Sequence, residues 1–257
     1  MSDRAVLDLA KRTDAACNLV CFPFAAGGPG TFRRWVADVP PWVGVWSAHL
    51  AGREGRFDQP PRNDLKEQVT ELVDAVQPLL DRPIVFYGHS LGATLAAHVA
   101  QELFPCADVA CSLIVGARRS PWSPPYEGWD VIDFSTVSDR ELIHAYVDLG
   151  ATPPEVLGNR ELLDVLMPVI RADAELAQAA SFIREGVLSV PVHALYGRDD
   201  TLVGAEPLGA WRRITTGPFT LTEITGDHFF LNTHRTLVQD HVLPVLLSTI
   251  RRRRIPS

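Results

Sequence analysis

A short apolar run that leads directly into a glycine-flanked serine is the feature that most limits the folds open to this chain. The run from Ile84 to Tyr87 is apolar, β-branched and aromatic, as a buried parallel strand should be. It leads into Gly88-His89-Ser90-Leu91-Gly92, and the residues from Leu91 to Phe104 then follow the period of an amphipathic helix. Strand, tight turn and helix in this order are the repeating unit of an α/β fold.

The turn between this strand and this helix indicates that Ser90 is a nucleophile. A sharp turn strains the serine backbone and projects its side chain above the sheet, so the flanking residues must be small enough for the helix to approach. Gly88 and Gly92 meet that need. The following helix directs its N-terminus at the serine, where the free N–H of Leu91 would favour developing negative charge. The alternative interpretation is a glycine-rich turn with an incidental serine.

Strand-like runs alternate with helical patterns along most of the chain. The strands are predicted at residues 18–24, 43–50, 83–87, 112–116, 190–197 and 219–225, and the helices at 31–39, 64–80, 91–104, 206–214 and 229–250. Alternation of this kind implies βαβ units and a largely parallel central sheet with helices on both faces. At 257 residues, we expect a single α/β domain over residues 1–257.

One region, about residues 120–186, interrupts this alternation. It has no convincing strand and consists of a Pro/Trp-rich link followed by helical segments near 139–149, 159–170 and 173–184. The simplest interpretation is a helical lid insertion over the carboxyl ends of the strands, where the ligands of open α/β sheets bind. The alternative is a helical embellishment with no role in substrate binding.

Bulk properties exclude some functions and favour a cytoplasmic enzyme. A net charge of −7 argues against a nucleic-acid partner, and no apolar run approaches the roughly 20 residues that span a membrane. The segment from Met1 to Ala16 is polar and lacks the apolar core of a signal peptide. The four cysteines lie in or beside apolar segments without CxxC pairing, so we expect reduced, buried thiols.

A serine nucleophile needs a base, and the base needs an acid that holds its tautomer. The predicted strand at 219–225 ends in Gly226-Asp227-His228, which makes His228 the best base; Asp227 is expected to fix the turn. The predicted strand at 190–197 is followed by Asp199 and Asp200, and either could be the acid while the other caps a helix. The remaining histidines are expected to be structural, with the His89 side chain turned away from the site: His49, His89, His98, His144, His193, His234 and His241.

A second oxyanion donor should come from the loop after the first core strand. That loop runs from Cys21 to Gly28 and contains small residues that let backbone N–H groups face a pocket. The Phe24 N–H is the candidate, paired with the N–H of Leu91. The alternative is a plain glycine-rich turn.

Motifs over nearly the whole length resemble the type II thioesterases, the stand-alone editing enzymes of polyketide and nonribosomal peptide synthetases, which have the α/β-hydrolase fold. The motifs are Phe22-Pro23-Phe24-Ala25, Phe32-Arg33-Arg34-Trp35, Gly52-Arg53-Glu54, Gly88-His89-Ser90-Leu91-Gly92-Ala93, Gly116-Ala117-Arg118-Arg119, Leu149-Gly150-Ala151-Thr152-Pro153, Arg171-Ala172-Asp173, Gly197 to Val203 and Gly226-Asp227-His228-Phe229-Phe230-Leu231. The family nucleophile falls on Ser90, its acid on Asp200, its base on His228 and its first-loop oxyanion donor on Phe24. The chain departs from the family pattern at Ala26, Ala51, Ala174 and the pair Ala179-Ala180.

The resemblance implies hydrolysis of acyl thioesters, through an acyl-serine intermediate, from the phosphopantetheine arm of acyl carrier or peptidyl carrier proteins. It implies no metal or redox cofactor. Carrier proteins are usually acidic, so the candidate docking or phosphate-contacting residues are Arg33, Arg34, Arg53, Arg118 and Arg119. Two alternatives stay open: another serine hydrolase or acyltransferase of the same fold acting on small esters or acyl-CoA, and a non-catalytic carrier-binding member of the fold.

Overall fold

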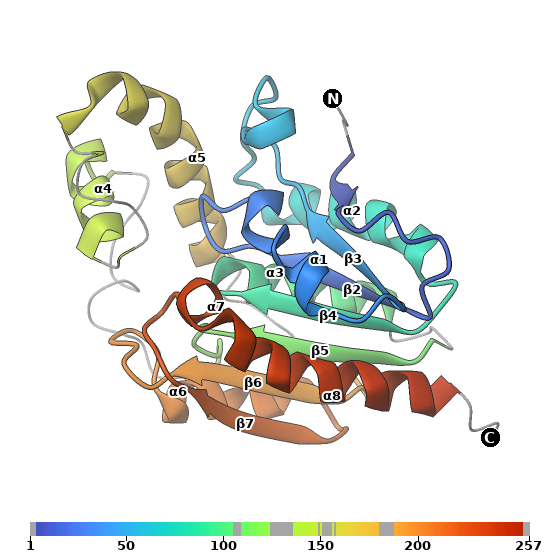
Figure 1. The fold of residues 1–257 in the computed structure, drawn as a ribbon. Helices are drawn as coiled ribbons and strands as arrows, with labels where there is room; N and C mark the ends of the chain where they lie inside the picture. The colour runs from blue at the N-terminus through green and yellow to red at the C-terminus, as the bar shows by residue number, and fades with distance from the viewer. Residues whose placement is uncertain are drawn as a thin grey trace.

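A seven-stranded sheet forms the centre of the molecule (Figure 1). The computed structural model describes residues 4–104, 109–123, 136–148, 150, 156, 158–179 and 188–253. The strand order is β1-β3-β2-β4-β5-β6-β7, and every neighbouring pair is parallel except β1 with β3. The strands are β1 (Val6–Asp8), β2 (Cys17–Phe22), β3 (Val43–Ala48), β4 (Ile84–His89), β5 (Cys111–Gly116), β6 (Val192–Gly197) and β7 (Phe219–Ile224). The mostly parallel α/β sheet predicted from the sequence is confirmed.

The sheet is buried on both faces by two layers of helices (Figure 1). One apolar cluster joins the sheet to α2 (Leu65–Val76), α3 (Leu91–Leu103) and α6 (Ala205–Gly209). A second cluster joins the opposite face to α1 (Trp35–Asp38) and α8 (Arg235–Arg253). All six residues of β4 are buried, which explains why its sequence is apolar without alternation. Every helix in the described ranges is too short or too polar to cross a membrane.

The remaining elements are helices, and they differ from the prediction mainly in where one helix ends and the next begins. These elements are α4 (Asp139–Asp148), α5 (Arg160–Ala179), α7 (Phe230–Thr233) and the 3₁₀ helices η1 (Pro29–Phe32), η2 (Glu54–Arg56), η3 (Gln77–Leu79) and η5 (Ala210–Ile214). The two helices expected at 159–170 and 173–184 are a single α5 up to Ala179, because the helix continues through Arg171 and Ala172. The helix expected at 229–250 is divided at His234, whose backbone is not helical. The strand β1 was not expected, because a strand of three residues is too short to give a pattern.

Helices α4 and α5 lie between β5 and β6 in the chain, where the sequence predicts an insertion. They share a small apolar cluster of their own, which includes Leu142, Tyr146 and Ile170. Other parts of the predicted insertion, residues 124–135, 149, 151–155, 157 and 180–186, lie outside the described residues, as does Cys106. The thiols of Cys17, Cys21 and Cys111 are free and buried, as expected.

The turn between β4 and α3 allows very close contact between backbone segments. Ser90 has a φ of 53°, a conformation that side-chain-bearing residues rarely adopt. A Cβ atom on Gly92 would lie 2.1 Å from the carbonyl oxygen of Phe22, and one on Gly88 would lie 2.3 Å from the carbonyl oxygen of Gly92. Glycine at both positions therefore lets α3 pack directly on the end of β2.

The variant Gly92→Ala should destabilise the fold, because the added methyl group overlaps backbone atoms that cannot rotate away. We expect a loss of at least about 2 kcal/mol in the free energy of unfolding, measured in urea. Gly158→Ala is the matched control, since none of the described residues beyond its chain neighbours comes within 4 Å of an added Cβ there. Equal stability of the two variants would show that the contact at Gly92 is not required.

Candidate active site

Ser90, His228 and Asp200 form one chain of hydrogen bonds at the carboxyl edge of the sheet. The Ser90 Oγ lies 3.1 Å from the His228 Nε2, and the His228 Nδ1 lies 2.9 Å from the Asp200 Oδ2. The three residues follow β4, β7 and β6, which are parallel and therefore end at the same edge. In this arrangement the serine hydroxyl donates to Nε2, and the Nδ1–H donates to the carboxylate.

Of the two candidate acids, Asp200 is the one that contacts His228. The Asp200 carboxylate is fully buried, and its Oδ1 accepts the backbone N–H groups of Leu202 and Val203 at 2.9 and 3.1 Å. These bonds leave the Oδ2 directed at His228. Asp199 is exposed, and Asp227 accepts the N–H of Phe229 at 2.9 Å, so it fixes the turn as predicted.

The side chain of His89 contacts the candidate site, contrary to the expectation that it turns away from it. Its Nε2–H donates to the backbone carbonyl of His228 at 2.7 Å, and its Nδ1 lies 3.2 Å from the Tyr87 hydroxyl, which donates to it. Burial lowers the pKa of His89 to about 3. The ring is therefore neutral and holds the loop that carries His228. No pattern in the sequence indicates this role, because it depends on a contact between residues 139 positions apart.

The two predicted oxyanion donors lie at the end of β2 and at the start of α3. Leu91 is the first residue of α3, and Phe24 follows the end of β2 by two positions. Among the described residues, neither backbone N–H donates a hydrogen bond to another protein group. The Phe24 ring packs edge-on against Phe229, with the ring centroids 5.0 Å apart, so the loop after β2 contacts the loop that carries His228.

A buried ion pair holds the loop after β2 in place. Arg53 and Asp173 are joined by two hydrogen bonds, of 2.6 and 2.8 Å, and their side chains are 7% and 1% exposed. Asp173 also accepts the N–H of Ala26 at 2.7 Å, while Arg53 donates to the carbonyl of Gly27 at 3.2 Å. The prediction that Arg53 docks a partner is wrong, because this arginine lies in the interior and supports the loop that carries Phe24.

Comparison with known proteins places this chain in a family. A family model described as "Thioesterase domain" matches residues 17–246. The chain belongs to the thioesterase family. Its enzyme class is thioester hydrolase, and its resemblance to type II thioesterases is confirmed.

Three relatives illustrate this thioesterase match. "Gramicidin S biosynthesis protein GrsT" of Aneurinibacillus migulanus is 31% identical over 218 residues, which are 84% of this chain and 84% of that protein. The medium-chain S-acyl fatty acid synthase thioesterase of Rattus norvegicus is 29% identical, over 87% of this chain and 84% of that protein. The solved type II thioesterase BorB from the borrelidin biosynthetic cluster has a TM-score of 0.82 and 30% identity, and the match covers 97% of this chain and 99% of that one.

The buried, neutral His89 should make stability depend on pH. In the unfolded chain its pKa returns to about 6.5, so below that pH the unfolded state binds a proton that the folded state excludes. Stability should therefore be lost as the pH falls from about 6.5 toward 3, by up to about 1.4 kcal/mol per pH unit. We expect His89→Gln, which keeps an N–H donor but does not titrate, to reduce this slope by about 1 kcal/mol per unit between pH 6 and pH 5.

Urea unfolding of the wild type and of His89→Gln at both pH values measures this difference. A residual slope is expected in the variant, because burial also lowers the pKa of His49 and His193. Identical slopes in the two proteins would contradict the assignment of a neutral His89.

The variant Asp173→Asn should be strongly destabilised, because it leaves the Arg53 charge buried without its partner. Breaking a pair of this kind costs about 3 to 5 kcal/mol of folding free energy, measured by urea unfolding. Asp164→Asn on the exposed face of the same helix is the matched control and should change stability by less than about 0.5 kcal/mol. A similar small change in both variants would show that the buried pair does not stabilise the loop.

Proposed function

We propose that this thioesterase hydrolyses acyl groups from the phosphopantetheine arms of carrier proteins, with Ser90 as nucleophile. The observation that carries the proposal is the hydrogen-bonded series of Ser90, His228 and Asp200 at the carboxyl edge of the sheet. A serine, a histidine and a buried carboxylate in this geometry are the groups that acyl transfer to serine requires.

The first half of the reaction forms an acyl-serine. The Nε2 of His228 takes the hydroxyl proton as the Ser90 Oγ attacks the thioester carbonyl, and Asp200 stabilises the imidazolium that results. The negative charge on the former carbonyl oxygen is received by the N–H groups of Phe24 and Leu91. Collapse of this intermediate breaks the carbon–sulfur bond, and the His228 imidazolium returns its proton to the departing thiolate.

The second half of the reaction releases the acid. His228 removes a proton from water, the resulting hydroxide attacks the acyl-serine carbonyl, and the same two N–H groups receive the charge again. Departure of the Ser90 oxygen, protonated by His228, frees the carboxylic acid and restores the enzyme.

The carrier-bound substrate class is supported by the relatives and by the insertion between β5 and β6. GrsT is named for gramicidin S biosynthesis, and BorB is a type II thioesterase of a biosynthetic cluster. Helices α4 and α5 add an apolar cluster to which Ala25 contributes, beside Phe24. An insertion packed against the loop of the oxyanion donor is well placed to act as a lid over an acyl chain.

The variants Ser90→Ala and Asp200→Asn test the mechanism. With acyl-loaded carrier proteins and mass-spectrometric detection of acyl loss, Ser90→Ala should reduce turnover by at least about 10³-fold and abolish the acyl-enzyme adduct. Asp200→Asn should reduce kcat by on the order of 10⁴-fold, because the amide favours the wrong histidine tautomer. Asp199→Asn is the control and should retain activity.

Two results would reject this proposal. Normal hydrolysis by Ser90→Ala would remove the nucleophile and the mechanism together. A large preference of the wild type for small oxygen esters or acyl-CoA over carrier-bound thioesters would instead favour the other hydrolases and acyltransferases of this fold.

A further inference from the structure

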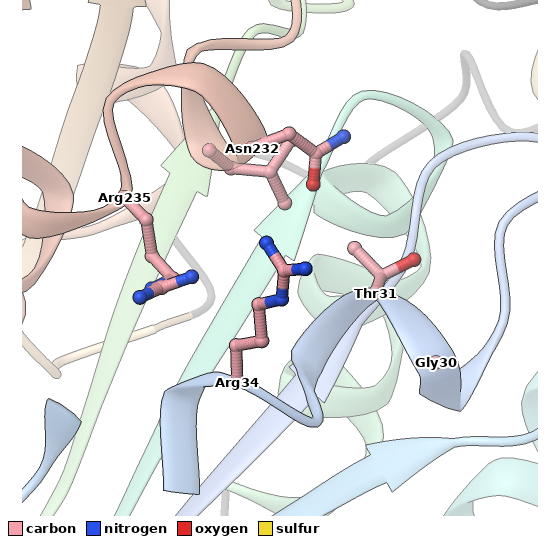
Figure 2. Close-up of a pocket in the computed structure, with 6 residues that line it drawn as sticks. Gly30, Thr31, Arg34, Asn232 and Arg235 are labelled. Atoms are coloured by element: carbon pink, nitrogen blue, oxygen red, sulfur yellow. The ribbon is translucent and has the colours of Figure 1, made fainter. Parts of the chain in front are cut away.

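A polar cavity of about 360 Å³ lies between the segment after β2 and the segment after β7 (Figure 2). Its lining consists of Gly30, Thr31, Arg34, Leu231, Asn232 and Arg235. The first three belong to η1 and the residues that join it to α1, and the last three belong to α7 and the start of α8. Figure 2 shows the Arg34 guanidinium extending into the space between Thr31, Asn232 and Arg235.

Two arginines give this cavity positive charge, and a carboxylate pairs with only one of them. Among the described residues, the exposed Arg34 side chain has no hydrogen-bond or ion-pair partner. Arg235 is paired with Asp38. The carboxylate of Glu54, which accepts the N–H of Gly30 at 2.8 Å, lies 3.8 Å from the guanidinium of the neighbouring Arg33. One unpaired guanidinium therefore remains in the cavity, together with a hydroxyl and an amide that can donate hydrogen bonds.

Both walls of the cavity continue along the chain from segments of the proposed active site. Its first wall follows the loop that carries Phe24, and its second wall begins with α7, which starts two residues after His228. Asn232 is four residues from His228, so their Cα atoms are at most about 14 Å apart. Leu231 is buried, and this holds the second wall against the core.

We propose that this cavity binds the phosphate ester at the end of a pantetheine thioester. The inference rests on the proposed function, because that function brings a thioester to Ser90 on a long arm that ends in a phosphate. Guanidinium groups bind phosphate oxygens through paired, charge-assisted hydrogen bonds, and Arg34 offers this fork without first breaking an ion pair. Thr31 and Asn232 add neutral donors on either side. The phosphate belongs either to a carrier-protein arm or to coenzyme A.

The test compares substrates that differ only in the group attached to the far end of the pantetheine. The same acyl group is presented on pantetheine, on phosphopantetheine, on coenzyme A and on a carrier protein, and kcat/KM is measured for the wild type, Arg34→Ala and Arg34→Lys. We expect Arg34→Ala to lower the ratio of kcat/KM for acyl-phosphopantetheine to that for acyl-pantetheine by about 10- to 100-fold. Arg34→Lys should restore part of this ratio, since it keeps the charge but loses the fork. Arg251→Ala, an exposed arginine near the far end of α8, is the control and should leave the ratio unchanged.

The four substrates separate the possible outcomes. A matching loss on the carrier protein identifies the carrier arm as the source of the phosphate, whereas a loss on phosphopantetheine and coenzyme A without one on the carrier protein identifies the nucleotide thioester. A loss confined to coenzyme A would overturn the proposed site, because it would leave the phosphate of phosphopantetheine without a role. An equal loss on all substrates, acyl-pantetheine included, or no loss on any, would overturn the proposed phosphate site. If instead the wild type hydrolyses none of the four thioesters, the proposed function fails, and that result is distinct from failure of the phosphate site.

Discussion

The direct contact of α3 with the end of β2 is the constraint on which the rest of the structure depends. Because Gly92 lies against the carbonyl of Phe22, the first turn of α3 and the loop after β2 meet at one place. The two predicted oxyanion donors, on Phe24 and Leu91, come from these two segments. A larger residue at this contact would strain the fold and would also separate the two predicted donors, so Gly92 is required for the fold and for the proposed oxyanion site.

Two of the loops at the carboxyl edge are held by polar contacts with distant parts of the chain, and the third is held by contacts within itself. The loop of His228 is held by the ring of His89, the loop of Asp200 by its own N–H groups, and the loop of Phe24 by the pair of Arg53 and Asp173. These contacts are internal to the protein and need no substrate to form. The site is therefore organised before an acyl group arrives, which is the condition under which fixed dipoles are most effective in catalysis.

Much of this arrangement could be predicted from the sequence, because it follows from local patterns. Apolar runs defined the parallel strands, and the order of strand ends placed Ser90, Asp200 and His228 at one edge. The choice between Asp199 and Asp200 could not be made from spacing alone, since both follow Gly197 closely and only the turn geometry directs one toward His228. Sequence reasoning took Arg53 for a surface charge because its partner Asp173 is 120 residues away. Contacts at such separations leave no periodic signal in a single sequence.

The pair of Arg53 and Asp173 also limits how the inserted helices could move. Asp173 lies in the second half of α5, so that half is tied by its carboxylate to the loop after β2. Pro168 lies five residues earlier, and its ring nitrogen cannot donate the hydrogen bond that would join it to the preceding turn. Swinging the whole insertion outward would expose two unpaired charges, whereas bending α5 at the proline leaves the pair intact. The half of α5 after Pro168 is therefore fixed against the loop that carries Phe24, and α4 packs on this same half through Ile170 and Ala174.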